Sequence, residues 1–214
     1  LNCWLNPRPR KPLMSKTICL ALTGASGMPY GLRLLECLLA AGCTVQLLYS
    51  QASQIVAKQE MDFELPSRPA EAKAALLARY PAVNPEKLLV FGREEWFAPV
   101  ASGSNPPDAM VICPCSMGTM AAIAQGLADK LIERAADVVL KEGRKLVLVP
   151  RETPFSAIHL ENMLRLSRAG AVILPPSPGF YHHPKTVQDI VDFVVARILD
   201  QIRIPHTLMQ RWGA

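Results

Sequence analysis

Two charged residues follow an apolar segment in the second half of the sequence. Arg151 and Glu152 come directly after residues 145–149 and Pro150. Charged groups at such a point are costly to bury unless each has a partner, so the pair indicates either a surface salt bridge or a site. In a site, Arg151 would bind an anion and Glu152 would move a proton. The residues alone leave both interpretations open.

Four further residues have side chains that bind anions. Arg134 and Lys141 are seven positions apart in a segment expected to be helical, so two turns place them on one face; a solvated charged face is the alternative. Tyr181 lies in a proline-rich loop at 175–184, and Arg197 flanks the apolar stripe of the last predicted helix. These residues matter for function only if several of them converge on one anionic ligand.

Small and hydroxyl-bearing residues follow three other apolar segments. They are Gly24-Ala25-Ser26-Gly27 after residues 17–23, Ser50 after residues 44–49, and Ser116-Met117-Gly118-Thr119 shortly after residues 109–113. Glycines let the backbone approach a ligand closely, and the start of the following helix binds anions. Tight turns and helix caps at the two serines are the alternative, and both interpretations can hold together.

The nucleotide that would suit these loops is a mononucleotide. The dinucleotide fingerprint Gly-x-Gly-x-x-Gly is absent, and the second apolar segment ends in Tyr49-Ser50-Gln51 instead of the carboxylate that binds an NAD ribose.

Apolar segments and amphipathic segments alternate along the chain. We predict strands at 17–23, 44–49, 88–91, 109–113, 145–149 and 171–174, and helices at 29–41, 51–60, 71–80, 116–125, 131–141 and 155–168. A last helix carries the stripe Val187, Ile190, Val191, Val194, Val195 and Ile198. Uniformly apolar strands that alternate with helices predict a three-layer, doubly wound, mostly parallel α/β sheet of the Rossmann or flavodoxin-like class. Ligands bind outside the carboxyl ends of such strands, where the loops above should meet.

Length and composition are those of one globular domain. The chain has 214 residues, of which 50% are hydrophobic and 19% charged. Residues 1–13 are expected to be an extension ahead of Met14, with the domain at 14–214. Of the formal net charge of +5, three charges come from Arg8, Arg10 and Lys11, which leaves too little to suggest nucleic acid. No membrane span or signal peptide is evident, so the protein is expected in the cytoplasm.

The six cysteines are expected to be thiols. Cys113 and Cys115 stand on either side of Pro114 and lack the second pair that a zinc site needs. In a reducing cytosol we expect buried or site-lining thiols, with no metal and no disulfide framework.

Together these residues resemble the UbiX-type flavin prenyltransferases, a family related to the phosphopantothenoylcysteine decarboxylases. The resemblance runs from Ile18 to Trp212. It is carried by the strings TGASG (23–27), Tyr30-Gly31, 113–116, ERAAD (133–137), 140–142, PRETP (150–154), His159-Leu160, GFYH (179–182) and Arg211-Trp212. Gln51 and Met28-Pro29 depart from the usual pattern, outside the phosphate and acid–base sets.

The resemblance implies two ligand sites and a set of catalytic residues. It implies that FMN is held by Gly24, Ala25, Ser26, Ser50, Ser116, Met117, Gly118, Thr119 and Arg151. It implies that Tyr181, Arg197, Arg134 and Lys141 bind the phosphate of dimethylallyl phosphate, and that Ser26, Glu60, Glu152 and Lys141 are catalytic. The prenyl group would join N5 and C6 of reduced FMN, without a metal, to make a cofactor for a UbiD-type decarboxylase, often in ubiquinone biosynthesis. Relatives form homo-oligomers, commonly dodecamers, with sites at subunit junctions.

Three alternatives remain at this point. A flavin-dependent decarboxylase of the related type needs a histidine in the early helix, and residues 26–41 contain none. A non-enzymatic carrier that delivers FMN to a partner decarboxylase needs no second phosphate site. The third alternative is a Rossmann-like binding protein without enzymatic activity, and the strings given above argue against it.

Overall fold

A computed structural model describes residues 15–209 and residue 213. The strands are β1 (Thr17–Leu22), β2 (Thr44–Tyr49), β3 (Leu88–Val90), β4 (Ala109–Cys115), β5 (Lys145–Pro150) and β6 (Val172–Ile173). The helices are α1 (Met28–Ala40), α2 (Gln51–Met61), α3 (Pro69–Arg79), α4 (Met117–Ala124), α5 (Leu131–Lys141), α6 (Ala157–Arg168) and α7 (Val187–Gln201), with short 3-10 turns η1 (Pro85–Lys87) and η2 (Pro99–Ala101). The predicted extension at 1–13, Met14 and the Arg211-Trp212 string lie outside the described residues.

The six strands form one parallel sheet in the order β3-β2-β1-β4-β5-β6. Ile18 of β1 pairs with Val45 of β2 on one side and with Ala109 of β4 on the other. The chain winds outward from β1 in one direction and then from β4 in the other, so the order reverses between these two strands. This arrangement confirms the predicted doubly wound α/β fold, and it places the expected ligand crevice between β1 and β4.

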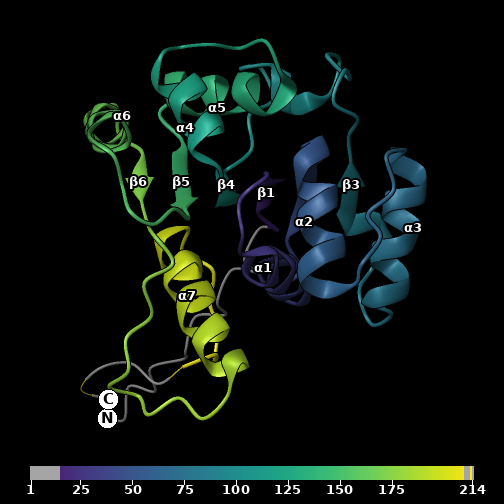
Figure 1. The fold of residues 1–214 in the computed structure, drawn as a ribbon. Coiled ribbons are helices and arrows are strands. Elements are labelled where there is room, and N and C mark those ends of the chain that lie inside the picture. Colours follow the sequence, from purple (N-terminus) through teal and green to yellow (C-terminus); the bar gives the residue numbers. More distant parts are fainter. Residues whose placement is uncertain (1–14, 210–212, 214) are drawn as a thin grey trace, which may run out of the picture.

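Side chains that alternate along each strand supply a core on each face of the sheet. Ile18, Leu20 and Leu22 pack in the core that includes α1, α2, α3 and α7. Cys19 and Ala21 pack in the second core, with α4, α5 and Met163 and Leu166 of α6. Figure 1 shows α1 and α7 on one side of the strands and α4 and α5 on the other. The helices on the two faces are therefore separated by the sheet.

The predicted elements are confirmed with shifts at their ends. Strand β6 has two residues where four were predicted, and β4 continues two residues further, to Cys115. In α7 the predicted stripe is buried at Val191, Val194, Val195 and Ile198, but Val187 is 76% exposed. That part of the prediction is wrong because Val187 is the first residue of α7, one turn before the helix enters the core.

Candidate functional site

Thr23 joins the two loops at the point where the strand order reverses. Its backbone N–H and its hydroxyl both donate to the carbonyl oxygen of Pro114, over 3.1 and 2.9 Å. The same hydroxyl oxygen accepts the backbone N–H of Ser116 over 2.7 Å. Thr23 is fully buried, so these bonds fix the loop after β1 against the loop after β4. In the sequence, its place in the TGASG string is the only feature that points to Thr23.

Glycine is required at two positions of the loop after β1. A side chain at Gly24 would collide with Cβ of Ala52, in the first turn of α2. Gly27 has a φ of 122°, a conformation that other residues rarely adopt. The loop therefore lies directly against the start of α2, and the backbone around half-buried Ser26 is left close to the crevice.

The start of α1 is capped by a residue from α2. The Glu60 carboxylate accepts the N–H of Gly27 over 3.0 Å and that of Met28 over 2.8 Å. Two of the donors expected to bind an anion at this helix start are therefore already taken by a carboxylate. Glu60 therefore contacts the residue that follows Ser26, and its contacts are those of a helix cap.

The two serines expected to cap helices do so. Ser50 Oγ accepts the N–H of Ser53 over 3.1 Å at the start of α2. Ser116 Oγ accepts the N–H of Thr119 over 3.3 Å and donates to the Thr119 hydroxyl over 3.0 Å. Both caps lie at the carboxyl edge of the sheet, on either side of the β1 loop.

A cavity of about 350 Å³ opens beside these caps, between the ends of β2 and β3 and the starts of α4 and α5. Ser50, Gln51 and Thr119 line it, together with Glu133 of the ERAAD string. Three further charged residues in its lining, Arg93, Glu94 and Lys130, belong to none of the motifs described above. Its volume lies in the range of small-molecule sites, which runs from about 300 to 1,000 Å³.

Hydrogen bonds hold some of the charged side chains that line this cavity. Glu133 is only 4% exposed, and its carboxylate accepts the N–H of Asp129 and of Lys130, each over 3.2 Å. Arg93 donates to the side-chain oxygen of Gln51 over 3.3 Å. The other Glu133 oxygen lies 3.5 Å from the Lys130 ammonium, so Lys130 is already paired, and Arg93 is the cation of this lining that has no ion pair among the described residues. Their position, after β3 and before α5, gave no sequence signal because neither belongs to a recognisable motif.

Arg151 and Glu152 follow β5 at the same edge of the sheet, and both are exposed. The Arg151 N–H donates to the carbonyl of Cys115 over 3.4 Å, which ties this loop to the end of β4. The Glu152 carboxylate accepts the N–H of Thr153 over 3.1 Å. Within residues 15–209 neither side chain makes a salt bridge, so the surface-salt-bridge interpretation has no support in that part of the chain.

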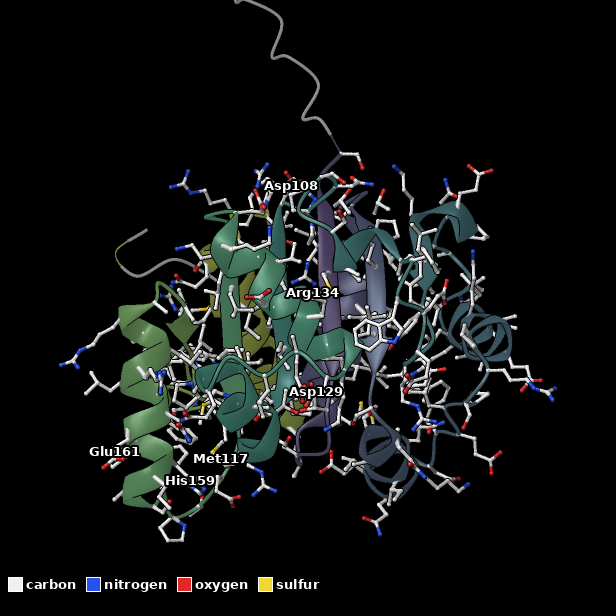
Figure 2. The ribbon with its side chains drawn as sticks, turned by 90° about the horizontal axis from the view of Figure 1, so that it is seen from above. Asp108, Met117, Asp129, Arg134, His159 and Glu161 are labelled. Atoms are coloured by element: carbon white, nitrogen blue, oxygen red, sulfur yellow. The ribbon has the colours of Figure 1, made fainter. Side chains whose placement is uncertain are left out.

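Arg134 and Lys141 lie along α5, as predicted. Arg134 donates to the carbonyl of Ala101 over 3.0 Å and pairs with Asp137 over 2.8 Å. Lys141, two turns later, pairs with Glu142 over 2.6 Å. In the view of Figure 2 Arg134 is seen between Asp108, which precedes β4, and Asp129, which precedes α5. Lys141 is the last residue of α5, just ahead of the amino end of β5, and so lies far from the loops that follow the strands.

Tyr181 packs against α7, the helix that carries Arg197. The Tyr181 ring packs edge-on against Phe193, with ring centres 5.8 Å apart. Phe193 also stacks with His182, with centres 5.1 Å apart. Arg197 follows Phe193 by four residues, which is one helical turn. Phe193 thus packs Tyr181 against α7, one helical turn before Arg197.

One chain does not bring the four predicted phosphate ligands together. Arg134 and Lys141 are on α5, which packs in one core, whereas Arg197 and the residue that supports Tyr181 are on α7, which packs in the other. The sheet lies between these helices. The set can meet around one phosphate only if α5 and α7 come from different copies of the chain.

The described cysteines are free thiols with little reactivity. Cys19, Cys113 and Cys115 are fully buried, and burial raises the pKa of each thiol well above its ordinary value. Burial also raises the pKa of Cys37, to about 11. Thiolates, which act as nucleophiles and metal ligands, are therefore disfavoured. Across residues 15–209 and 213, no cluster of three or more His, Cys, Asp or Glu side chains has the arrangement of a metal site. In the same residues, no helix combines the length and the apolar character needed to cross a bilayer.

The flavoprotein family matches residues 7–199. The UbiX flavin prenyltransferase of Pseudomonas aeruginosa is 58% identical over 196 residues, which cover 92% of this chain and 93% of that protein. This chain belongs to the UbiX-type flavoproteins. Membership agrees with the predicted family and with the strings that suggested it.

Solved structures of UbiX-type proteins have the same fold as this chain. The dodecameric FMN-dependent UbiX-like decarboxylase of Escherichia coli O157:H7 is 42% identical, with a TM-score of 0.81, and the match covers 92% of this chain and 100% of that one. AnUbiX (PadA1), solved with FMN and dimethylallyl pyrophosphate, is 39% identical with a TM-score of 0.83, and covers 94% of this chain and 99% of that one.

Proposed function

We propose that this UbiX-type chain transfers the dimethylallyl group of dimethylallyl phosphate to N5 and C6 of reduced FMN. The observation that supports this proposal is that anion-binding residues lie in two separate places, the second of which would form a site only between copies of the chain. One set surrounds the crevice and cavity at the carboxyl edge of the sheet, and the other consists of Arg134, Lys141, Tyr181 and Arg197. A flavin needs only the first set. The names of the relatives, which are flavin prenyltransferases, agree with a second, prenyl phosphate site.

The residues at the carboxyl edge fit FMN. Ser50 and Thr119 line the cavity and offer hydroxyls, and the start of α4 supplies backbone donors of the kind that bind phosphate. Arg151 lies exposed at the same edge. Gly24, Ala25 and Ser26, together with Ser116–Thr119, would contact the rest of the nucleotide. When bound and reduced, FMN supplies the electron-rich ring that accepts the prenyl group.

The phosphate ligands would act when the prenyl carbon–oxygen bond breaks. Negative charge then develops on the departing phosphate, and fixed cationic donors stabilise it. Arg197 and Arg134 present forked donors, Lys141 adds a point charge, and Tyr181 adds a hydroxyl. Glu152, as a general acid, would donate a proton to the leaving phosphate. Ser26 and Glu60 would orient N5 and accept protons as the new ring closes at C6.

A homo-oligomer would complete this site. Since α5 and α7 lie on opposite faces of one sheet, the phosphate ligands require at least two copies of the chain. The dodecameric state of the E. coli relative supports the same assembly here. We further propose that the protein acts in the cytoplasm and that its product is used by a UbiD-type decarboxylase, as in ubiquinone biosynthesis.

Two other functions are weaker fits. The E. coli relative is described as a decarboxylase, but α1 lacks the histidine that the related decarboxylases use as a base. An FMN carrier has no use for residues such as Arg197 and Lys141, which lie away from the flavin loops.

Anaerobic incubation tests the proposal directly. The protein is incubated with reduced FMN and dimethylallyl phosphate, and the flavin is then examined by mass spectrometry and absorption. The expected result is a flavin heavier by one dimethylallyl group. Recovery of unmodified FMN from protein that binds FMN tightly would support the carrier instead.

A further inference from the structure

One acidic residue, Asp200, holds the Arg197 side chain. Its Nη1 donates to Oδ2 of Asp200 over 2.7 Å, three residues further along α7. The side chain is 48% exposed, and within residues 15–209 its guanidinium makes no other hydrogen bond. Its remaining N–H groups are therefore available to a ligand that comes from outside the chain.

Asp200 is in turn held by a buried histidine. The other carboxylate oxygen, Oδ1, lies 3.2 Å from Nε2 of His206, whose side chain is only 10% exposed. Because an ionised carboxylate can only accept, Nε2 must carry the hydrogen in this contact. The second ring nitrogen, Nδ1, is buried and has no partner in the described part of the chain. Asp200 is thus the polar contact that the His206 ring makes there.

The segment that carries His206 is fixed to the body of the domain. After α7 the chain turns back at Arg203, and the N–H of Ile204 donates to the carbonyl of Leu199 over 3.0 Å. Ile202 and Ile204 are 3% and 5% exposed. Lys16, ahead of β1, donates to the carbonyl of Ile202 over 2.9 Å. His206 therefore projects from an anchored segment.

The anchored His206 segment distinguishes the Arg197–Asp200 ion pair from an ordinary surface ion pair. An isolated ion pair three residues apart on a helix contributes little and leaves both side chains free to move. Here one oxygen of Asp200 is occupied by an anchored histidine, so the other oxygen has a defined position for Arg197. A ligand-binding group that is already oriented loses less conformational entropy when the ligand binds.

We propose that Asp200 and His206 are positioning residues, which orient the Arg197 guanidinium so that its free N–H groups meet the prenyl phosphate. The inference rests on the function proposed above, in which Arg197 binds that phosphate. Asp200 acts through Arg197, and His206 acts through Asp200.

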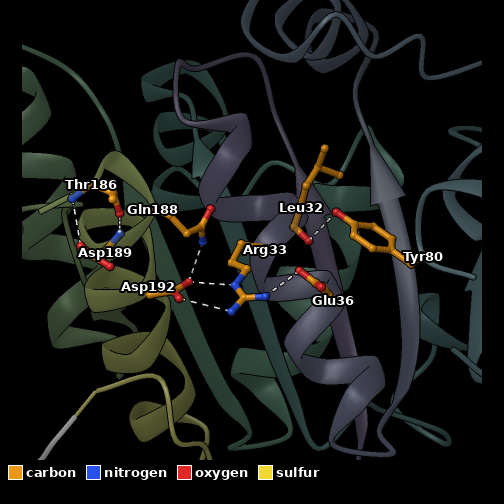
Figure 3. A network of polar contacts seen from close by, with 8 residues as sticks. All are labelled: Leu32, Arg33, Glu36, Tyr80, Thr186, Gln188, Asp189 and Asp192. Atoms are coloured by element: carbon orange, nitrogen blue, oxygen red, sulfur yellow. Dashed lines mark hydrogen bonds and ion pairs between the residues drawn. The ribbon is translucent and has the colours of Figure 1, made fainter. Parts of the chain in front are cut away.

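A matched control lies on the same helix. Asp192 accepts from Nε of Arg33 over 2.8 Å and from Nη2 over 3.2 Å, and Figure 3 shows this pair joining α7 to α1. Asp192→Asn removes an ion pair from α7 without touching Arg197. We expect it to lower the melting temperature and to leave prenyl phosphate binding unchanged.

The test measures the dissociation constant of dimethylallyl phosphate by calorimetry on FMN-loaded protein, together with KM, kcat, FMN affinity and melting temperature. Asp200→Asn should weaken dimethylallyl phosphate binding about three- to tenfold, as a loss of orientation at one charged contact would. FMN affinity should stay unchanged, whereas kcat should fall as well, because Arg197 also stabilises the departing phosphate. His206→Leu should act in the same direction, whereas His206→Gln, which keeps an N–H near the position of Nε2, should restore binding.

A double-mutant cycle decides between positioning and a general charge effect. In an Arg197→Ala background, Asp200→Asn should have no further effect, because the residue it positions is gone. Arg197→Ala can weaken the binding of dimethylallyl phosphate while Asp200→Asn leaves that binding unchanged or tightens it. In that case the positioning role is wrong and the proposed function stands. If Arg197→Ala itself leaves dimethylallyl phosphate binding unchanged, the phosphate role of Arg197 and the present inference both fail.

Discussion

The carboxylate of Glu60, at the end of α2, accepts the backbone N–H of Met28, at the start of α1, over 2.8 Å. It also accepts the N–H of Gly27, so a residue predicted to be catalytic stabilises the loop that carries Ser26. A carboxylate at a helix start is favoured by the helix dipole and by the unpaired N–H groups there. Glu60 can therefore act by positioning the Ser26 loop or by transferring a proton, and substitutions distinguish these two roles.

Glu60→Ala should lower the stability of the protein, because it removes the acceptor of two backbone donors. Loss of a helix cap costs about 0.5–2 kcal/mol. Glu60→Gln keeps one acceptor oxygen but cannot take a proton, so it should unfold close to the wild-type temperature and turn over roughly a hundredfold more slowly. Thermal unfolding and single-turnover kinetics check both variants, with Glu64→Gln as a control on an exposed carboxylate. Wild-type turnover in Glu60→Gln would leave Glu60 with the capping role alone.

Glu152→Gln should slow product formation while leaving FMN affinity nearly unchanged. The Glu152 carboxylate is exposed and contacts only the N–H of Thr153 among the described residues, so its loss should not disturb the fold. General acid–base catalysis contributes roughly 10²–10⁴-fold in rate. Turnover and flavin titration measure the two quantities, and Glu161→Gln on α6 is the control. A variant as fast as the wild type would remove Glu152 from the mechanism.

The sequence predicted the loops of the site better than it predicted their mutual positions. Hydroxyl residues after apolar strands gave the helix caps at Ser50 and Ser116, since capping depends on local residue types. The bonds from Thr23 to Pro114 and Ser116 join positions about 91 residues apart in the chain, and no local pattern encodes such a contact. For the same reason nothing in the sequence pointed to Phe193, whose ring packs against Tyr181.

The placement of Arg134 and Arg197 on opposite faces was also beyond local patterns. Each helix shows its own apolar stripe, but which face of the sheet a helix covers depends on the order of the strands. That order, with its reversal between β1 and β4, is a property of the whole fold.

Asp189→Asn should destabilise the start of α7 in a pH-dependent way. Hydrogen bonds from the backbone N–H groups of Lys185 and Thr186 lower the pKa of Asp189, and Figure 3 shows the contact with Thr186. A lowered pKa in the folded state stabilises the protein above the ordinary aspartate pKa of about 3.9, and this stabilisation is lost as the pH falls through the folded value. The melting temperatures of variant and wild type should therefore differ at pH 7 and converge in acid. A difference that did not depend on pH would assign the effect to packing.

Chelation should leave turnover unchanged. In the proposed site Arg134, Lys141 and Arg197 provide the positive charge that other prenyltransferases obtain from Mg²⁺. Turnover is measured after dialysis against EDTA, with and without added Mg²⁺. Loss of activity that Mg²⁺ restores would show that these side chains do not suffice to stabilise the leaving phosphate.

Mixing two inactive variants should restore activity if the prenyl phosphate site is shared between copies. Lys141→Ala removes a ligand on α5 and Arg197→Ala removes one on α7, and the sheet separates these helices within each chain. After dissociation and reassembly of a 1:1 mixture, random association in a symmetric oligomer gives about a quarter of the sites both intact helices. Turnover should therefore recover to about that fraction of the wild-type value, whereas mixing Lys141→Ala with itself should recover none. If α5 and α7 acted within one chain, every site in the mixture would carry one of the two substitutions, and activity would stay at the level of the separate variants.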